Sequence, residues 1–215
     1  SCSGIEETAR IAGTTATHSG EMIEDVIINS NYQLSATTGE DGRYAFTQNT
    51  MYQRYELAPY KNDDPLNGVS SRDLVILQEF LIGIRQISDP FIQIAADING
   101  DGKITALDLV DLRKLLLGYE TEFPSNDSWR FIIKDFEWDD IRNPYDFEEI
   151  NGITSLDKDY MDEDWIGVKI GDLSGDAFAN SKDQLSTIRR SESLRLNIQN
   201  RKNIPWQTKS GQFKN

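Results

Sequence analysis

The run Asp97-Ile98-Asn99-Gly100-Asp101-Gly102-Lys103-Ile104-Thr105-Ala106-Leu107-Asp108 decides the fold of the central part of this 215-residue chain. Oxygen-bearing side chains stand at positions 1, 3, 5, 9 and 12 of the run, and a glycine stands at position 6. A loop with this spacing can wrap a hard cation, because calcium takes six to eight oxygen ligands at about 2.3–2.6 Å. The alternative, a solvated acidic turn, would match this spacing only by chance. We therefore predict a calcium site whose ligands are Asp97, Asn99, Asp101, the carbonyl oxygen of Lys103, Thr105 and Asp108.

A second, weaker copy of the pattern precedes the first by 35 residues. Asp73 aligns with Asp108, and Gly83 aligns with Gly118. Within each aligned segment apolar residues recur at i, i+3, i+4 and i+7, which predicts a helix that ends at a glycine suited to the left-handed conformation. The upstream loop carries fewer carboxylates, so we expect a weaker calcium site there. Its predicted ligands are Asn62, Asp64, the carbonyl oxygens of Leu66 and Gly68, Ser70 and Asp73.

The order of loop, single helix, linker, loop and single helix, from about Asn62 to Gly118, resembles the dockerin family. Dockerins are calcium-binding modules of cellulosomes and of many bacterial surface proteins, so the resemblance implies two Ca²⁺ ions, an extracellular location and a protein partner. The aspartate at position 12, Asp108, fits dockerins better than the longer glutamate of ordinary EF-hands. Dockerins that bind cohesins usually carry a hydroxyl pair at loop positions 10 and 11, where this chain has Ser71-Arg72 and Ala106-Leu107. The fold is therefore expected to carry over, whereas a cohesin-like partner is not the favoured expectation.

Residues 1–60 alternate in the manner of short β-strands separated by turns. Val26-Ile27-Ile28 and Tyr44-Ala45-Phe46 are β-branched and aromatic runs of this kind. Several such strands at this spacing predict an antiparallel β-sandwich. The stretch from Ile11 to Phe46 also resembles carboxypeptidase regulatory-like and Ig-like modules of bacterial surface proteins, which are usually spacers. Val168-Lys169-Ile170-Gly171-Asp172 is similar to segments of large secreted surface proteins of Bacteroidetes.

The sequence after residue 119 carries weaker signals. Trp129 to Ile133 and Trp165 to Ile170 look like strands that could join the sandwich or cover the helical part. Asp172-Leu173-Ser174-Gly175-Asp176 repeats the oxygen spacing of positions 1, 3 and 5, with Asp183 at position 12. Because position 6 is not glycine and no amphipathic helix follows, we interpret this segment as a turn, and the alternative that it holds a cation stays open. Leu194 to Ile198 alternates like a strand, which could complete the sheet of another copy.

The predicted fold class is α+β, an N-terminal antiparallel β-sandwich joined to a dockerin-like helical module with two calcium loops and followed by short strands. The expected division is residues 1–60 for the spacer, 61–119 for the calcium module, 120–178 for an acidic extension with strands, and 179–215 for a basic linker or further β element.

The net charge of −14 is unevenly distributed. Residues 120–176 hold 17 Asp and Glu against five Lys and Arg, whereas residues 181–215 hold eight basic and two acidic residues. An acidic surface repels nucleic acid, so no nucleic-acid partner is expected. No apolar stretch approaches the roughly 18–20 residues that span a bilayer, so no membrane span is expected.

Motifs for catalysis are weak in this chain. The single histidine, His18, lies in an expected hairpin turn, and the single cysteine, Cys2, has no nearby base in the sequence. No phosphate-binding glycine loop or serine nucleophile motif occurs, although a pair of glycosidase carboxylates is not excluded by counting. We therefore expect a non-enzymatic, calcium-stabilised structural or adhesive module of an extracellular bacterial surface or filament-forming protein. The alternative is a targeting module that docks a secreted enzyme or surface protein onto a cohesin-like partner. Other copies of the chain or adjacent domains of its parent are further candidate partners.

Overall fold

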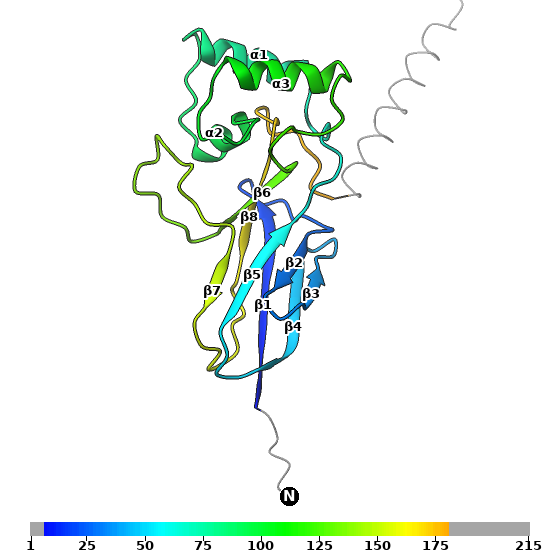
Figure 1. Cartoon of the computed structure of the whole chain (residues 1–215), viewed down its shortest axis with the longest axis vertical. Helices are drawn as coiled ribbons and strands as arrows, with labels where there is room; N and C mark the ends of the chain where they lie inside the picture. The colour runs from blue at the N-terminus through cyan, green and yellow to red at the C-terminus, as the bar shows by residue number, and fades with distance from the viewer. Residues whose placement is uncertain (1–6, 181–215) are drawn as a thin grey trace, which may run out of the picture. The chain divides into compact units, whose positions relative to one another are not determined.

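The computed structural model describes residues 7–180, so the predictions for Cys2, Asp183 and Leu194 to Ile198 concern residues outside the described range. Within these residues the chain order is five strands, three helices and three further strands, and Figure 1 labels them. The first strands are β1 (Thr8–Thr17), β2 (Ile27–Ser30), β3 (Ser35–Thr37), β4 (Arg43–Thr50) and β5 (Tyr55–Tyr60). The helices are α1 (Ser71–Leu81), α2 (Pro90–Ala96) and α3 (Ala106–Leu116), and the last strands are β6 (Trp129–Ile133), β7 (Asn151–Ile153) and β8 (Trp165–Lys169).

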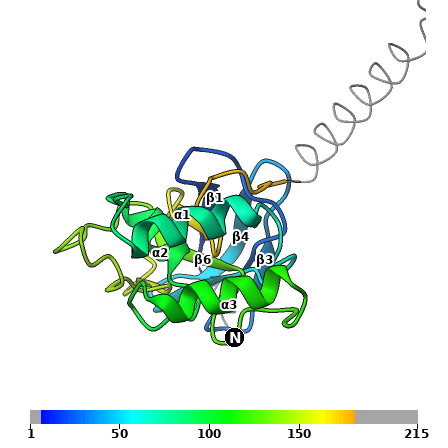
Figure 2. The ribbon, with the colours of Figure 1, turned by 90° about the horizontal axis from the view of Figure 1, so that it is seen from above.

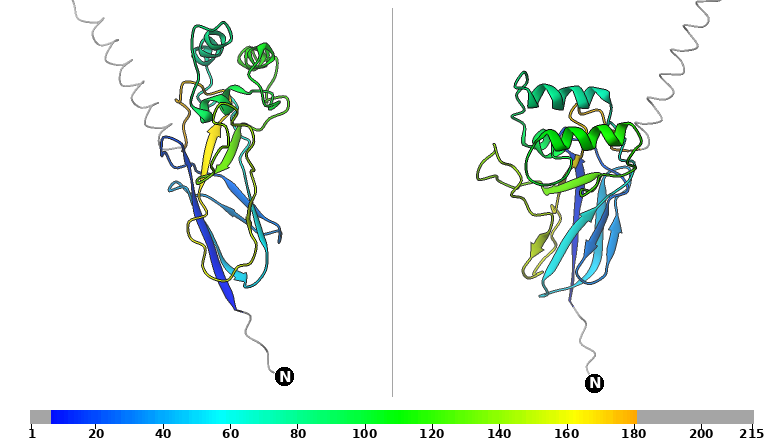
Figure 3. Two further views of the ribbon diagram at one scale, coloured as in Figure 1. Left: turned by 90° about the vertical axis from the view of Figure 1, so that its left-hand side faces the viewer. Right: turned by 45° about the horizontal axis from the view of Figure 1, so that its top comes forward.

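The strands form two four-stranded sheets, in the orders β4-β1-β8-β6 and β3-β2-β5-β7. The two sheets face each other in Figure 3, and side chains from both meet in one hydrophobic core. Ile11 and Trp165 enter that core from one sheet, and Ile28 and Leu57 enter it from the other. In β4, buried and exposed residues alternate over Arg43–Phe46, as expected of a strand with one face on a core.

The three late strands complete these sheets, which differs from the predicted boundary at residue 60. β8 lies between β1 and β6, with Thr15 opposite Trp165, and β7 pairs with β5. The β1–β8 pair is parallel, whereas the sequence predicted an antiparallel sandwich. Parallel neighbours need a long connection, and here the whole stretch between residues 18 and 164 lies between the two strands. The helical segment is therefore an insertion between β5 and β6, and all described residues fall in one compact unit.

The three helices lie beyond one end of β6 and β8, and α1 and α3 run side by side above α2 (Figures 1 and 2). Each of α1 and α3 is followed by a glycine with positive φ, Gly83 at 77° and Gly118 at 72°, as the repeat predicts. A second core cluster joins the helices to the strands. It contains Leu77 of α1, Ile94 of α2, Leu112 of α3 and Ile132 of β6, together with Ile170 just after β8.

Candidate metal centre

The loop 97–108 connects the end of α2 to the start of α3, and both ends are fixed by the helices. Asp97 is the C-cap of α2, and its carboxylate accepts hydrogen bonds from the amides of Asp101 (3.1 Å) and Gly102 (2.8 Å). Asp108 lies in the first turn of α3, where its carboxylate accepts from the amides of Thr105 (2.7 Å) and Asn99 (3.2 Å). The loop therefore folds around its first and last carboxylates.

The loop 97–108 holds buried carboxylates whose mutual repulsion a bound cation would offset. The Asp108 side chain is fully buried, and Asp97 is 5 % exposed. Burial raises the pKa of Asp97, its bonds to the amides of Gly102 and Asp101 oppose that rise, and the nearby carboxylates of Asp108 and Asp101 add to it. The ion pairs found among residues 7–180 all involve other carboxylates. Three acidic side chains thus share a short loop without a basic partner in the described chain.

The donor set of this loop fits calcium. Within residues 7–180 no group of three or more His, Cys, Asp or Glu side chains forms a metal cluster by itself. The predicted site instead combines carboxylates with the amide, hydroxyl and carbonyl oxygens of Asn99, Thr105 and Lys103, which are hard ligands suited to Ca²⁺ rather than to zinc. All six predicted ligands of this loop belong to one short segment that already turns around Asp97 and Asp108.

Two residues outside the loop support it, Asn126, which carried no signal in the sequence, and Tyr145, whose aromatic ring is expected from the sequence to anchor the core or a loop. Asn126 donates from its amide nitrogen to the carbonyl oxygen of Asp97 (3.0 Å), and it accepts a bond from Arg130 (3.3 Å). Tyr145 lies beside the loop, since a Cβ atom built on Gly102 would be 3.8 Å from the Cβ of Tyr145. Both residues belong to the segment between α3 and β7, which therefore covers the loop.

The upstream loop has a well-formed second half. Ser70 is the N-cap of α1, and the Asp73 carboxylate accepts from the Ser70 amide (2.8 Å) and hydroxyl (2.9 Å), as Asp108 does with Thr105. The Asp73 side chain is fully buried. The structure thus brings together the two ligands predicted nearest to α1.

The predicted first half of the upstream loop is placed differently. Asn62 is exposed, and its side-chain oxygen accepts from the amide of Ser128, just before β6 (2.9 Å), so this oxygen is already bonded outside the predicted loop. Asp64 is exposed as well, and its carbonyl oxygen accepts from the Asn67 amide (3.0 Å) within a turn. The carbonyl oxygen of Leu66 is likewise engaged, by the Val69 amide (3.0 Å). This stretch docks onto β6, a contact that a local pattern cannot reveal.

The remaining oxygen of Asp73 is bonded to a distant segment that the sequence marked only as a turn. It accepts from the amides of Leu173 (2.9 Å) and Ser174 (2.8 Å), about one hundred residues further along the chain. Asp172 is buried, and its carboxylate accepts three backbone amides, from Gly175, Asp176 and Ala177, together with the hydroxyl of Ser174 (3.4 Å). Asp172, Ser174 and Asp176 were therefore missed as partners of α1, although their oxygen spacing was visible in the sequence.

The helical segment matches the model of a known protein family. Residues 66–117 match the family model of the dockerin type I domain. The match covers about a quarter of the chain and includes α1, α2 and α3 with both Asp73 and Asp108. Dockerin domains bind Ca²⁺ through EF-hand-like loops, occur in extracellular proteins and interact with other proteins, typically cohesins. The prediction of a dockerin-like module is thus confirmed for this segment. No curated protein and no solved structure matches the chain.

None of the helices in residues 7–180 has the length and apolar character needed to cross a bilayer.

Proposed function

We propose that the chain is a non-catalytic, calcium-stabilised structural module of an extracellular surface or filament-forming protein. The observation that carries this proposal is the way the dockerin-like helices are built into the two-sheet body. They share a core with Ile132, Val168 and Ile170, which belong to or adjoin β6 and β8. The amide of Gly171 also donates to the carbonyl oxygen of Ala95 in α2 (2.9 Å). A module inserted and packed in this way is suited to a rigid joint.

The contact between β1 and α2 adds to this joint. The ring of His18, just beyond β1, stacks on Phe91 of α2 with centroids 5.3 Å apart. Phe91 in turn contacts the ring of Trp138 edge-on at 5.4 Å. The only histidine of the chain therefore takes part in packing, which supports a structural role better than a catalytic one.

Calcium would stabilise the joint by neutralising buried carboxylates. A cation bound by the loop 97–108 offsets the repulsion among Asp97, Asp101 and Asp108 and binds the folded state alone. Extracellular modules work with dissociation constants of about 10⁻⁴–10⁻³ M, near the calcium concentration outside cells. The extracellular setting of dockerin modules and the resemblance of residues 11–46 to spacer modules support this location and role.

Thermal unfolding with and without chelator tests the proposal. Each ion at about 100 times its dissociation constant stabilises by about 2.7 kcal/mol. For a unit of this size 1 kcal/mol corresponds to roughly 2–4 °C, so excess EDTA should lower the Tm by about 5–10 °C for one ion and restoring calcium should reverse the change. An identical melt in EDTA and in calcium would contradict the proposal.

A docking function is the second candidate, favoured by exposed apolar side chains at matching positions of the two repeated helices. Val75 of α1 matches Val110 of α3, and Ile82 matches Leu117, and all four are exposed. A pull-down with immobilised cohesins in calcium tests this alternative. Capture by wild type, and loss of capture in Val75→Asp/Val110→Asp, would favour docking over a purely structural role.

A further inference from the structure

The segment 172–177 makes the same contacts as the first half of the loop 97–108. Asp97 accepts the amides four and five residues later in the chain, Asp101 (3.1 Å) and Gly102 (2.8 Å). Asp172 accepts the amides at the same two offsets, Asp176 (3.2 Å) and Ala177 (2.9 Å). Position 1 of a calcium loop is therefore reproduced at Asp172.

Position 12 is reproduced as well, but by a residue from another part of the chain. Asp108 bonds the amides of loop positions 3 and 9, which are Asn99 and Thr105. Asp73 accepts from the amide of Ser174, the third residue of its segment (2.8 Å), and from the amide of Ser70, the N-cap of α1 (2.8 Å). The same four backbone contacts thus define both sites.

Two further positions agree between the sites. Position 4 is a glycine with positive φ in each, at 70° for Gly100 and 72° for Gly175. Position 2 is a buried aliphatic side chain in each, Ile98 and Leu173, and both belong to the same core cluster. The two segments therefore share backbone course and packing as well as carboxylates.

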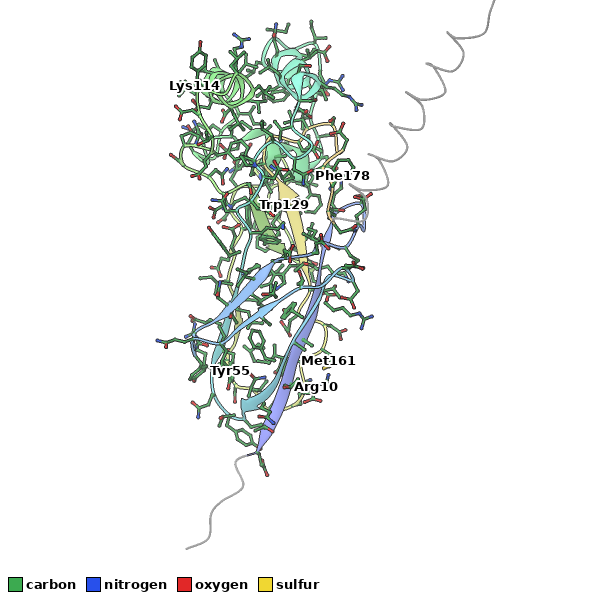
Figure 4. All side chains as sticks on the ribbon, turned by 90° about the vertical axis from the view of Figure 1, so that its right-hand side faces the viewer. Arg10, Tyr55, Lys114, Trp129, Met161 and Phe178 are labelled. Atoms are coloured by element: carbon green, nitrogen blue, oxygen red, sulfur yellow. The ribbon has the colours of Figure 1, made fainter. Side chains whose placement is uncertain are left out.

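The two halves of the second site meet at a tight junction between positions 6 and 7. A Cβ atom built on Gly68 would lie 2.4 Å from the Cα of Ala177, so only glycine fits there. Asn67 closes the junction with two bonds to the backbone of Phe178, accepting from its amide (2.9 Å) and donating to its carbonyl oxygen (2.8 Å). Figure 4 labels Phe178 at this point, below the helices.

The geometry points to a discontinuous calcium site in which the first half of the loop comes from residues 172–177 and the second half from residues 68–73. Its ligands are Asp172, Ser174, Asp176, the carbonyl oxygen of Gly68, Ser70 and Asp73. This inference rests on the proposed calcium-stabilised function, and it replaces the prediction that Asn62 and Asp64 supply the first half. The dockerin match, over residues 66–117, includes Gly68, Ser70 and Asp73 of the second half and excludes Asn62 and Asp64.

The charges at this site are arranged for a divalent cation. Asp73 and Asp172 are both buried, at 0 % and 7 % exposed. The buried ammonium group of Lys169 lies nearby, but it donates to the carbonyl oxygens of Pro65 (3.0 Å) and Ile170 (3.3 Å). Asp176 has only a long, exposed contact with Arg72 at 3.8 Å. The buried carboxylates of Asp73 and Asp172 thus lack a direct cationic partner among the described residues.

The matched variants Asp176→Asn and Asp64→Asn separate the discontinuous loop from the continuous one. Both aspartates are exposed, and each substitution removes one carboxylate, so the fold should survive both. Calcium titration calorimetry on the full chain should give two ions for wild type. Asp176→Asn should weaken one of the two sites about tenfold or more, because affinity follows the number of charged ligands. Asp64→Asn should leave both sites unchanged, and Asp101→Asn should weaken the other site.

Each contrary result has a distinct meaning. Weakening by Asp64→Asn but not by Asp176→Asn would overturn the discontinuous site in favour of the continuous one. A single ion in wild type, lost in Asp101→Asn and unaffected by Asp176→Asn, would overturn this inference and leave the proposed function standing. Absence of calcium binding in wild type would overturn both. Melts of all three variants in EDTA check that the substitutions themselves do not unfold the chain.

Discussion

Substitution of Asn67 by alanine should loosen the junction between the two halves of the discontinuous site. The change removes the two hydrogen bonds that Asn67 makes to the backbone of Phe178 (2.9 and 2.8 Å). At a net 0.5–1.5 kcal/mol for each bond, the loss is about 2 kcal/mol. If part of the free energy of calcium binding is then used to bring residues 67 and 178 together, the calcium affinity of that one site should fall by up to about 30-fold, at 1.4 kcal/mol for each factor of ten.

Asn31 offers a matched control within the sheets. Its side chain makes the same two-bond contact with the backbone of another segment, donating to Arg54 (3.1 Å) and accepting from Glu56 (3.2 Å). Asn31→Ala should therefore cost a similar amount of stability without changing calcium affinity. Calorimetric titration and thermal melts in saturating calcium measure the two quantities. Equal calcium affinities in Asn67→Ala and Asn31→Ala, with both melts lowered, would refute the role assigned to this junction.

Three further predictions concern packing and charge. Gly68→Ala should destabilise the protein more than Gly83→Ala, as measured by urea unfolding. Both glycines have positive φ, but a Cβ atom added at Gly68 would lie 2.4 Å from the Cα of Ala177, whereas one added at Gly83 meets no atom within 4 Å. Leu112→Ala should cost about 2–5 kcal/mol because Leu112 is fully buried, whereas Val110→Ala on the exposed face should change stability by less than about 0.5 kcal/mol, and equal costs would contradict the packing described. Burial raises the pKa of Glu163, so the folded state binds the proton of this carboxyl more tightly than the unfolded state. The free energy of unfolding should therefore fall as the pH rises from the ordinary pKa of 4.5 through the raised folded pKa. Urea titrations at a series of pH values should show this fall in wild type and a smaller one in Glu163→Gln.

The local parts of the fold were predictable from the sequence, because they depend on neighbours in the chain. The loop from Asp97 to Asp108 and the helices after Ser70 and Thr105 follow from spacing, capping side chains and apolar periodicity. The strands before residue 60 follow from alternation. Each of these signals is contained within about a dozen residues.

The long-range parts were not predictable in the same way. Nothing in the sequence of Trp165 to Lys169 specifies a parallel partner in β1, and nothing in Asp172 specifies a meeting with Asp73. Asn62 carried the correct ligand chemistry for a loop, yet the amide of Ser128 binds its oxygen instead. Tertiary contacts of this kind compete with local patterns, and only the folded chain shows which contact forms.

The separation between Asp73 and its amide partners has a consequence for how the chain becomes folded. Leu173 and Ser174 are synthesised about one hundred residues after Asp73, so the buried carboxylate waits for almost the whole unit before its bonds can form. Contacts of such high sequence separation slow folding. A chain that ends before this late segment would leave one Asp73 oxygen without its two amide donors, while the other oxygen keeps its bonds to Ser70, so the site can be completed only when synthesis of the unit is nearly finished.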